Sequence, residues 1–347
     1  MAERLSNSAT LWRLARDLGI KPSPDPLSAI LGYCHRRVGA FLTELSADST
    51  LEQLLEMTAN KVGTSFEVIR EEDDLERVRA TYTAHGERMF ARLAEELTAE
   101  VYGITFQLQR AQPWELPFVS VIDARGPKAA RVYFTKWHEV AHLLTLTSQG
   151  RLQFFRTHAE PARKDPEEVL ADIVAGLAGF YAPVTQRLAI GEPSFSRIKL
   201  VRDRLCPTAS VQAALIGITA AWREPLLLVR AQPALRKRDR EHVAHPSFDF
   251  MPRPEPSLRA VKITASIGAR SSGFTIHPNM RVPERSVIQR LFRFSFGHER
   301  ADEDMSWWEA SDGTRLPHCS VRVEARWGDG GVDALIFPME PHLKAPS

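Results

Sequence analysis

A histidine, a glutamate and a second histidine carry the clearest chemical signal in this sequence. They are His138, Glu139 and His142, in the pattern His-Glu-x-x-His. Residues four positions apart on a helix project from the same face, so the two imidazoles can bind one metal ion. Glu139 then lies on an adjacent face, where it can take a proton from a metal-activated water that attacks a peptide carbonyl. The pattern alone is weak, and its value depends on a third ligand.

A second helix, which follows the first in the sequence, offers that ligand. Asp165 can cap its start, and Pro166 suits its first turn. Glu168 and Asp172 are one turn apart and therefore share a face. The small residues that let this helix lie close to the first are Ala171, Ala175 and Gly179. We assign Glu168 as the third metal ligand and Asp172 as the carboxylate that orients a ligand histidine.

The same residues also have a simpler explanation. Asp165 and Glu168 fit a capping box at a helix start, which needs no metal. Glu167, His158 and Glu160 are weaker substitutes for the third ligand, because none of them pairs with a carboxylate one turn later. Three protein ligands would leave a fourth position for water, as a catalytic zinc site requires.

The elements around this site are expected to form a small sheet beside two helices. Strand-forming runs occupy residues 104–108, 118–123 and 131–134, and turn-forming residues separate the last two runs. We expect the third run to be a strand that leads directly into the metal helix, with Thr135 as the N-cap. If that strand is an edge, a substrate peptide can add to it as a further strand.

Length and composition fit an ordinary globular protein of two or three domains. The chain has 347 residues, of which 44% are hydrophobic and 25% charged, and its net charge of +2 does not indicate nucleic acid or a membrane as a partner. Three cysteines far apart in the sequence fit a reducing compartment and supply no disulfide framework. No signal peptide is visible, and no uncharged apolar run approaches the roughly 18 residues of a transmembrane helix. The sequence therefore predicts a cytoplasmic protein.

Apolar residues at helical spacing dominate the N-terminal part of the chain. They predict helices over residues 10–18, 27–45, 51–62 and 87–100, the last of them packed under the sheet. The acidic cluster at residues 71–74 fits a solvated helix start better than a metal site. Because no catalytic motif occurs here, we interpret the region as a packing extension, with a helical lid or docking module as the alternative.

Two further helices are predicted after the metal motif, over residues 195–205 and 209–222. The short break at residues 206–208 suits a helix-turn-helix segment. The second helix, however, has almost no cationic side chains for phosphates or bases, so direct DNA binding is disfavoured. A basic run at residues 236–240 and a Pro-rich stretch at 246–256 are interpreted as a solvated connector.

The C-terminal part alternates polar and apolar residues in the manner of β-strands. Predicted strands cover residues 261–265, 273–276, 321–325 and 332–337, and a helix is predicted over 283–292. The apolar stretch 225–229 before them could be a strand behind the two preceding helices. Such an order fits an α+β domain. Three tryptophans could line a pocket for a small molecule, although aromatic core residues are the commoner explanation: Trp307, Trp308 and Trp327. The later histidines show no ligand spacing: His277, His298, His318 and His342.

Together these motifs resemble one known family. The pattern Phe134-Thr-x-x-His138-Glu139-x-x-His142, followed by Glu168-x-x-Ala171-Asp172-x-x-Ala175 and a closing Pro183, is similar to that of the ImmA/IrrE metallopeptidases. The stretches 261–266, 273–276 and 282–283 are similar to the GAF-like third domain of the radiation-response members. Two departures stand out, because the family often has Asn in place of Asp172, and Leu-Met where this chain has Tyr181-Ala182.

The resemblance implies a zincin-like α+β core, Zn²⁺ or Mn²⁺ at the site, and a helix-turn-helix transcriptional repressor as the protein substrate. Cleavage would derepress stress, DNA-damage or mobile-element genes. On this basis the expected regions are a helical N-terminal region (1–84), a metallopeptidase core (85–185), a helix-turn-helix-like segment with a basic linker (186–247) and a GAF-like domain (257–347).

The rival interpretation is a non-hydrolytic sensor or transcription regulator with a structural or vestigial metal site. It predicts binding of metal, and of DNA or a small molecule, without hydrolysis. Glu139 favours the enzyme, because a structural site has no need of that carboxylate and usually closes its fourth position. The sequence does not identify the oxyanion-stabilising residue, since Tyr133, His158 and Tyr181 are near the site in sequence only.

Overall fold

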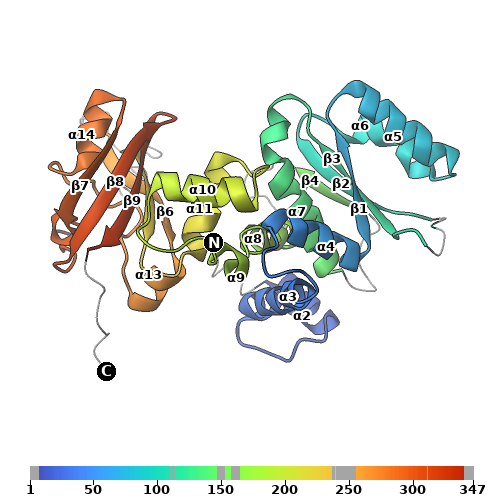
Figure 1. Ribbon diagram of the computed structural model, residues 1–347, viewed down its shortest axis with the longest axis horizontal. Coiled ribbons are helices and arrows are strands. Elements are labelled where there is room, and N and C mark those ends of the chain that lie inside the picture. Colours follow the sequence, from blue (N-terminus) through green and yellow to red (C-terminus); the bar gives the residue numbers. More distant parts are fainter. Residues whose placement is uncertain are drawn as a thin grey trace. The chain divides into compact units, whose positions relative to one another are not determined.

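The computed structural model describes residues 8–109, 111, 114–146, 165–236, 239, 255–310 and 312–339, and the backbone of 153–157. These residues form a mixed α and β structure, as expected, which divides into two compact units (Figure 1). The first unit comprises Met1–Val184 and Arg202–Ala213, and the second comprises Thr185–Val201 and Ala214–Ser347.

A four-stranded sheet in the order β1-β3-β2-β4 lies at the centre of the first unit. Its strands are β1 (Thr64–Ile69), β2 (Val101–Gln107), β3 (Phe118–Asp123) and β4 (Gln153–Thr157). β1 is parallel to β3, whereas β2 is antiparallel to both β3 and β4. The predicted strands at 104–108 and 118–123 are confirmed. β1 and β4 lie outside the predicted strands. Because β1 belongs to residues 1–84, the N-terminal region also contributes a strand to this sheet.

The N-terminal helices are confirmed close to their predicted bounds. They are α2 (Ala9–Asp17), α3 (Pro26–Leu42) and α4 (Leu51–Val62), followed after β1 by α5 (Glu72–Ala84), which begins at the acidic cluster. Local signals explain their ends. The Asp25 carboxylate caps α3, a Thr50–Gln53 capping box starts α4, and Gly63 with φ of 86° ends it.

Helices α7 (Val132–Leu144) and α8 (Pro166–Gly179) carry the metal motif. α7 packs against α8 and against β2 and β3, so it lies between the sheet and α8 (Figure 1). The short α9 (Ala182–Thr185) follows α8. By length and composition the stretch Pro166–Thr185 could cross a membrane, but 61% of its apolar window is buried inside the protein, as in the core helix of a soluble protein.

A five-stranded antiparallel sheet in the order β6-β5-β9-β8-β7 forms the second unit. Its strands are β5 (Leu227–Ala234), β6 (Ser257–Ala265), β7 (His298–Asp304), β8 (Ser320–Gly328) and β9 (Gly331–Pro338). It also contains α13 (Ile267–Ser272), η3 (Met305–Trp307) and α14 (Val287–Phe294), the last in place of the predicted helix at 283–292. The predicted helices at 195–205 and 209–222 are α10 (Phe195–Leu205) and α11 (Val211–Ala221), which are divided between the two units.

Three predicted elements are wrong. Residues 131–134 form no strand, because the 3₁₀ helix η2 (Gly126–Arg131) leads straight into α7, and Thr135 is buried inside that helix rather than at its cap. Residues 87–100 contain only η1 (Arg88–Arg92) and α6 (Leu93–Glu96) before β2. Residues 273–276 form no strand, since the chain leaves α13 through Gly273 in the left-handed conformation.

Because residues 131–134 form no strand, the hypothesis that a substrate peptide adds to a strand at this segment is wrong. The β-forming residues of this segment are helical, because packing against other elements outweighs small differences in intrinsic secondary-structure propensity. Tyr133, for example, is buried, and its hydroxyl donates a hydrogen bond to the carbonyl of Gly179 in α8.

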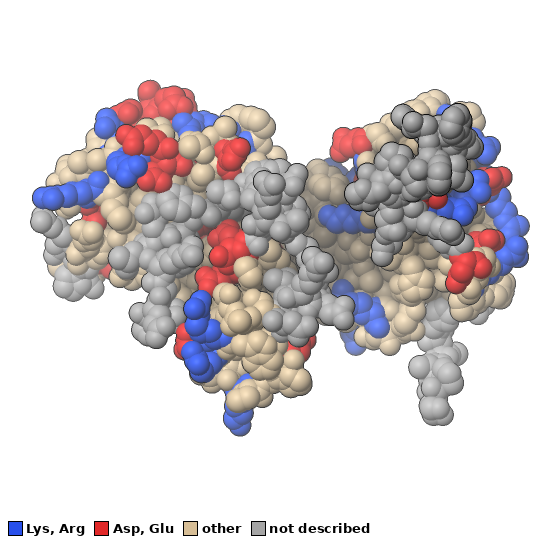
Figure 2. Space-filling model, turned by 180° about the vertical axis from the view of Figure 1, so that it is seen from behind, with Lys and Arg blue, Asp and Glu red and all other residues tan. Residues whose placement is uncertain are grey.

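Acidic and basic side chains are mixed over the face drawn in Figure 2. On the described part of that face we see no extended basic track for a nucleic-acid backbone, in line with the net charge of +2. Of the connector expected from the sequence, residues 237–238, 240 and 246–254 lie outside the described residues.

Candidate metal centre

Close packing holds α7 against α8. A Cβ atom at Gly179 would lie 3.1 Å from Cδ1 of Trp137 and 3.5 Å from Cε1 of Tyr133, so the glycine permits the approach of the two helices. Ala171 and Ala175 are buried on α8 as well. The small residues thus bring the carboxylates of α8 within reach of the histidines of α7.

Two histidines of α7 and one glutamate of α8 bring their ligand atoms together. Nε2 of His138 lies 3.0 Å from Nε2 of His142. Oε2 of Glu168 lies 3.3 Å from the first of these nitrogens, and its Oε1 lies 3.2 Å from the second. Within the described parts of the chain, no other group of three such side chains has its ligand atoms this close together.

These distances suit a metal ion. Atoms bound at about 2.0–2.1 Å to tetrahedral Zn²⁺ are separated by roughly 3.3–3.4 Å, which is close to the observed spacing. Two imidazole nitrogens facing each other at 3.0 Å can share at most one proton, whereas both can donate a lone pair to a cation. Two imidazoles and a carboxylate also form the ligand set of many hydrolytic zinc sites. The residues present therefore fit a divalent metal.

Glu168 is held in the ionised form that a metal ligand needs. Burial alone would raise the pKa of Glu168, but hydrogen bonds and charge from the His138 and His142 rings outweigh this and lower the pKa to about 2. The Glu168 side chain is 23% exposed, whereas those of His138 and His142 are 0% and 5% exposed. Solvent therefore reaches the cluster beside the glutamate.

Asp172 contacts the far side of one ligand ring. Its Oδ1 lies 3.0 Å from Nδ1 of His138. When Nδ1 carries the proton and donates it to this carboxylate, Nε2 keeps its lone pair on the side of His142 and Glu168. Asp172 thus lies where the helical spacing predicts an orienting carboxylate.

The Glu139 side chain is buried on the side of α7 that packs against the sheet. Its Oε2 accepts a hydrogen bond of 2.8 Å from Oγ1 of Thr105 on β2, and this hydroxyl lies 2.7 Å from Oγ of Ser120 on β3. A Cβ atom at Gly103 would lie 2.8 Å from the other carboxylate oxygen. No sequence motif marks Thr105, Ser120 or Gly103. Strand alternation, which puts Gly103 and Thr105 on one face of β2, is the signal that could have found two of them.

The capping explanation for the start of α8 holds in part. Asp165 caps the helix by accepting a hydrogen bond of 2.9 Å from the backbone N–H of Glu167. The Glu168 carboxylate, however, faces the two histidines. Glu167 is not in the group of ligand atoms, and His158 and Glu160 lie outside the described residues.

The two tyrosines that lie near the metal motif in sequence use their hydroxyls in hydrogen bonds to backbone carbonyls. The Tyr133 hydroxyl donates to the carbonyl of Gly179 at 2.5 Å, and the Tyr181 hydroxyl donates to the carbonyl of His35 at 3.2 Å. His158, which is also near the motif in sequence, lies outside the described residues.

The aromatic residues of the second unit serve mainly its core. Trp308 is buried there, Trp327 packs against the same core, and the Arg285 guanidinium covers the Trp307 ring at 3.9 Å from its centroid. Trp307 also lines a polar cavity of about 230 Å³ with Arg236, Arg259 and other residues.

The histidines near the C-terminus contact residues other than those of the metal motif. His298 lies 2.8 Å from Glu324, and His318 lies 2.5 Å from Asp304. His277 is outside the group of metal-ligating side chains, and His342 lies outside the described residues.

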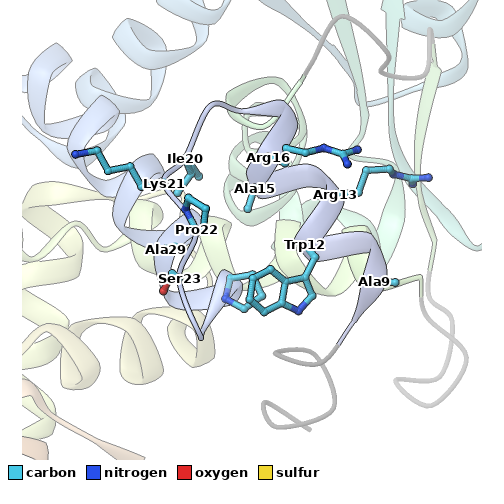
Figure 3. A pocket seen from close by; sticks show the side chains of 11 residues that line it. Ala9, Trp12, Arg13, Ala15, Arg16, Ile20, Lys21, Pro22, Ser23 and Ala29 are labelled. Atoms are coloured by element: carbon cyan, nitrogen blue, oxygen red, sulfur yellow. The ribbon is translucent and has the colours of Figure 1, made fainter.

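A larger cavity, of about 580 Å³, lies in the first unit between α2 and the segment that leads into α3 (Figure 3). Trp12, Arg13 and Lys21 are among the residues that line it. None of its lining residues belongs to the metal motif, so it is not part of the candidate site.

A scan against models of protein families found no match to this chain. A search of curated proteins found none either. Function is therefore inferred from the motif and from the geometry of its side chains.

Proposed function

We propose that the protein is a metal-dependent endopeptidase of the ImmA/IrrE type, in which His138, His142 and Glu168 hold Zn²⁺ or Mn²⁺. The observation that carries the proposal is the convergence of the three side chains: the two Nε2 atoms lie 3.0 Å apart, and each lies 3.2–3.3 Å from one of the two carboxylate oxygens of Glu168. A bound metal supplies Lewis-acid chemistry, because it lowers the pKa of water towards neutrality and polarises a carbonyl group. Three protein ligands leave a position for that water.

Glu139 acts as the general base. It takes the proton from water as the water attacks the peptide carbonyl, and it later gives this proton to the leaving amine. Asp172, 3.0 Å from Nδ1 of His138, keeps that ring in the tautomer whose Nε2 can serve as a ligand. A structural metal site would need no such base, so a buried Glu139 beside a ligand histidine favours the enzyme over the sensor.

The resemblance of the motif leads us to propose a cytoplasmic helix-turn-helix repressor as the substrate. Regulatory cleavage of this kind needs high selectivity, so we expect little activity on a generic substrate such as casein. We also propose a zincin-like core in the first unit and a GAF-like domain in the second. Direct DNA binding is not part of the proposal, since α11 has no Lys or Arg.

The test is cleavage of a repressor encoded beside this chain, with Zn²⁺ or Mn²⁺ added. Glu139→Gln keeps the size of the side chain but removes the base, so we expect cleavage to slow by about 10²–10⁴-fold while the metal stays bound. Glu167→Gln, which changes a neighbouring carboxylate outside the ligand group, is the control and should cleave at the wild-type rate.

An E139Q variant that cleaves as fast as the wild type would overturn the catalytic assignment. Metal binding combined with DNA or small-molecule binding, and with no cleavage of the repressor, would favour the sensor instead. A gel-shift assay at stated salt concentration, run beside the cleavage assay, separates the two.

A further inference from the structure

Three hydroxyl groups form a hydrogen-bonded chain behind Glu139. Oγ1 of Thr105 lies 2.8 Å from Oε2 of Glu139, Oγ of Ser120 lies 2.7 Å from Oγ1 of Thr105, and Oγ1 of Thr64 lies 3.0 Å from Oγ of Ser120. All four side chains are buried. They come from three neighbouring strands and from α7, so the chain links the sheet to the metal helix.

Strand register explains how the hydroxyls meet. Thr105 and Ser120 are directly opposite each other in the antiparallel pair of β2 and β3, so their side chains stand on the same face of the sheet. Thr64 lies on β1, the other neighbour of β3. A buried sheet face is normally apolar, and a run of three hydroxyls there is costly unless each finds a partner.

The carboxylate gives this chain a direction. An ionised carboxylate can only accept hydrogen bonds, so Thr105 must donate to Glu139. The Thr105 oxygen can then accept from Ser120, and the Ser120 oxygen from Thr64. Hydrogen bonds aligned in this way strengthen one another and fix the position of the carboxylate at their end.

Gly103 restricts the carboxylate from a second side. A Cβ atom at this position would lie 2.8 Å from Oε1 of Glu139 and 2.8 Å from Cγ2 of Thr135, which is closer than real Cβ contacts. Any larger residue would have to displace the Glu139 side chain or α7. Gly103 therefore leaves space for the Glu139 carboxylate, and the hydrogen bond from Thr105 holds the carboxylate in that space.

We propose that Thr105 and Ser120 are positioning residues that hold the Glu139 carboxylate in its orientation for proton transfer, and that Gly103 provides the space. The inference rests on the proposed role of Glu139 as general base. It adds a requirement that neither the metal ligands nor the His-Glu-x-x-His pattern contains, namely a hydroxyl donor on β2.

The positioning role is tested by comparing Thr105→Val with Thr105→Ser in the full chain. Valine keeps the shape but removes the donor, and serine restores it. We expect T105V to lower kcat for repressor cleavage by about 10-fold to 100-fold with little change in KM or zinc content, because a misplaced base loses rate rather than binding. T105S should stay within about threefold of the wild type, because it keeps the hydroxyl donor.

Thr58→Val is the matched control for stability. Thr58 is fully buried in α4, and its hydroxyl donates to the carbonyl of Leu54 at 2.7 Å rather than to Glu139. T58V therefore loses a buried threonine hydroxyl without changing the base, and its kcat should equal that of the wild type. Equal kcat values for T105V and the wild type, with E139Q inactive, would overturn the inference.

A crystal structure of T105V provides a readout apart from activity. We expect the Glu139 carboxylate to leave its wild-type orientation, and a Gly103→Ala structure should show it displaced as well. An unchanged carboxylate in T105V would refute the positioning role even if no cleavage were measured. If the wild type and E139Q instead cleave equally, the proposed function has failed, and the structures alone decide the role of Thr105.

Discussion

The role of each residue in the candidate site depends on which of its atoms carries a proton. His138 can serve as a ligand through Nε2 only when Nδ1 holds the hydrogen, and the nearby Asp172 carboxylate, at 3.0 Å, favours that tautomer. Removal of this carboxylate should leave the three ligands in place but allow the ring to rotate and to change tautomer.

We therefore expect Asp172→Ala to weaken zinc binding by about 10–100-fold. Asp172→Asn, whose amide oxygen can still accept the hydrogen bond, should cause a smaller loss. Competition with a chromophoric chelator measures the affinity, with Glu167→Ala as the control on the same helix. Wild-type affinity in D172A would show that Asp172 does not orient the histidine.

Some residues of the site could be predicted from the sequence, and others could not. His138, His142, Glu168 and Asp172 could be chosen from spacing alone, because helical periodicity fixes which side chains share a face. The contact of Thr105 with Glu139 could not, since it joins positions 34 residues apart and depends on how β2 lies against α7.

Among the elements, α7 depends on contacts at its C-terminal end. Arg37 of α3 donates a hydrogen bond of 3.0 Å to the carbonyl of Leu144, the last residue of α7. A cation at this end offsets the negative end of the helix dipole and satisfies a carbonyl that lacks a partner within the helix.

Loss of this contact should destabilise the protein. We expect Arg37→Met to lower the free energy of unfolding by about 1 kcal/mol. Arg36→Met, at the exposed neighbouring position, is the control and should have little effect. Urea denaturation followed by tryptophan fluorescence provides the comparison, and equal midpoints for the two variants would contradict the capping role.

The junction after β3 depends on a buried carboxylate. Asp123 lies 2.9 Å from Nε of Arg125 and 2.6 Å from Nζ of Lys128, and Lys128 also donates to the carbonyl of Val101 in β2. Burial would raise the pKa of Asp123, but the hydrogen bonds from Arg125 and Lys128 outweigh this and lower it. Asp123 therefore stabilises the fold above its unfolded-state pKa, and this contribution disappears as the pH falls through the lowered pKa.

Asp123→Asn should thus cost about 2–4 kcal/mol of unfolding free energy at pH 7, because it removes the buried carboxylate that Arg125 and Lys128 share and leaves Arg125 with the exposed Glu72 as its carboxylate partner. The difference from the wild type should shrink as the pH falls below about 4. Asp302→Asn, which removes an exposed partner of Arg322, is the control and should have little effect. A pH-independent difference would contradict this account of Asp123.

The predicted elements fail where packing decides between helix and strand. Residues 118–123 and 51–62 were predictable because their patterns and end signals agree. The β-forming residues at 131–134 became helical by packing against α8, and the charged edge strand β7 lacks the apolar alternation that would mark it.

The whole molecule consists of two compact units, and the metal ligands belong to only one of them. A ligand that binds only the folded state stabilises the unit that contains its site. At a free zinc concentration of 100 times Kd the gain is about 2.7 kcal/mol, which shifts Tm by roughly 5–10 °C for a unit of this size.

We therefore expect zinc to raise the melting transition of the first unit and to leave that of the second unchanged. Glu168→Gln should abolish most of the shift. Differential scanning calorimetry with and without zinc tests this, with limited proteolysis to assign each transition. Equal shifts in both transitions, or a full shift in E168Q, would contradict the location of the site.

Anomalous diffraction at the zinc edge, on crystals of the zinc-loaded protein, tests the central claim most directly. We predict one ion at about 2.0–2.2 Å from Nε2 of His138, Nε2 of His142 and a carboxylate oxygen of Glu168, with no fourth protein ligand. An ion bound elsewhere, or a Glu168 side chain turned away from it with no other acidic group in its place, would contradict the account.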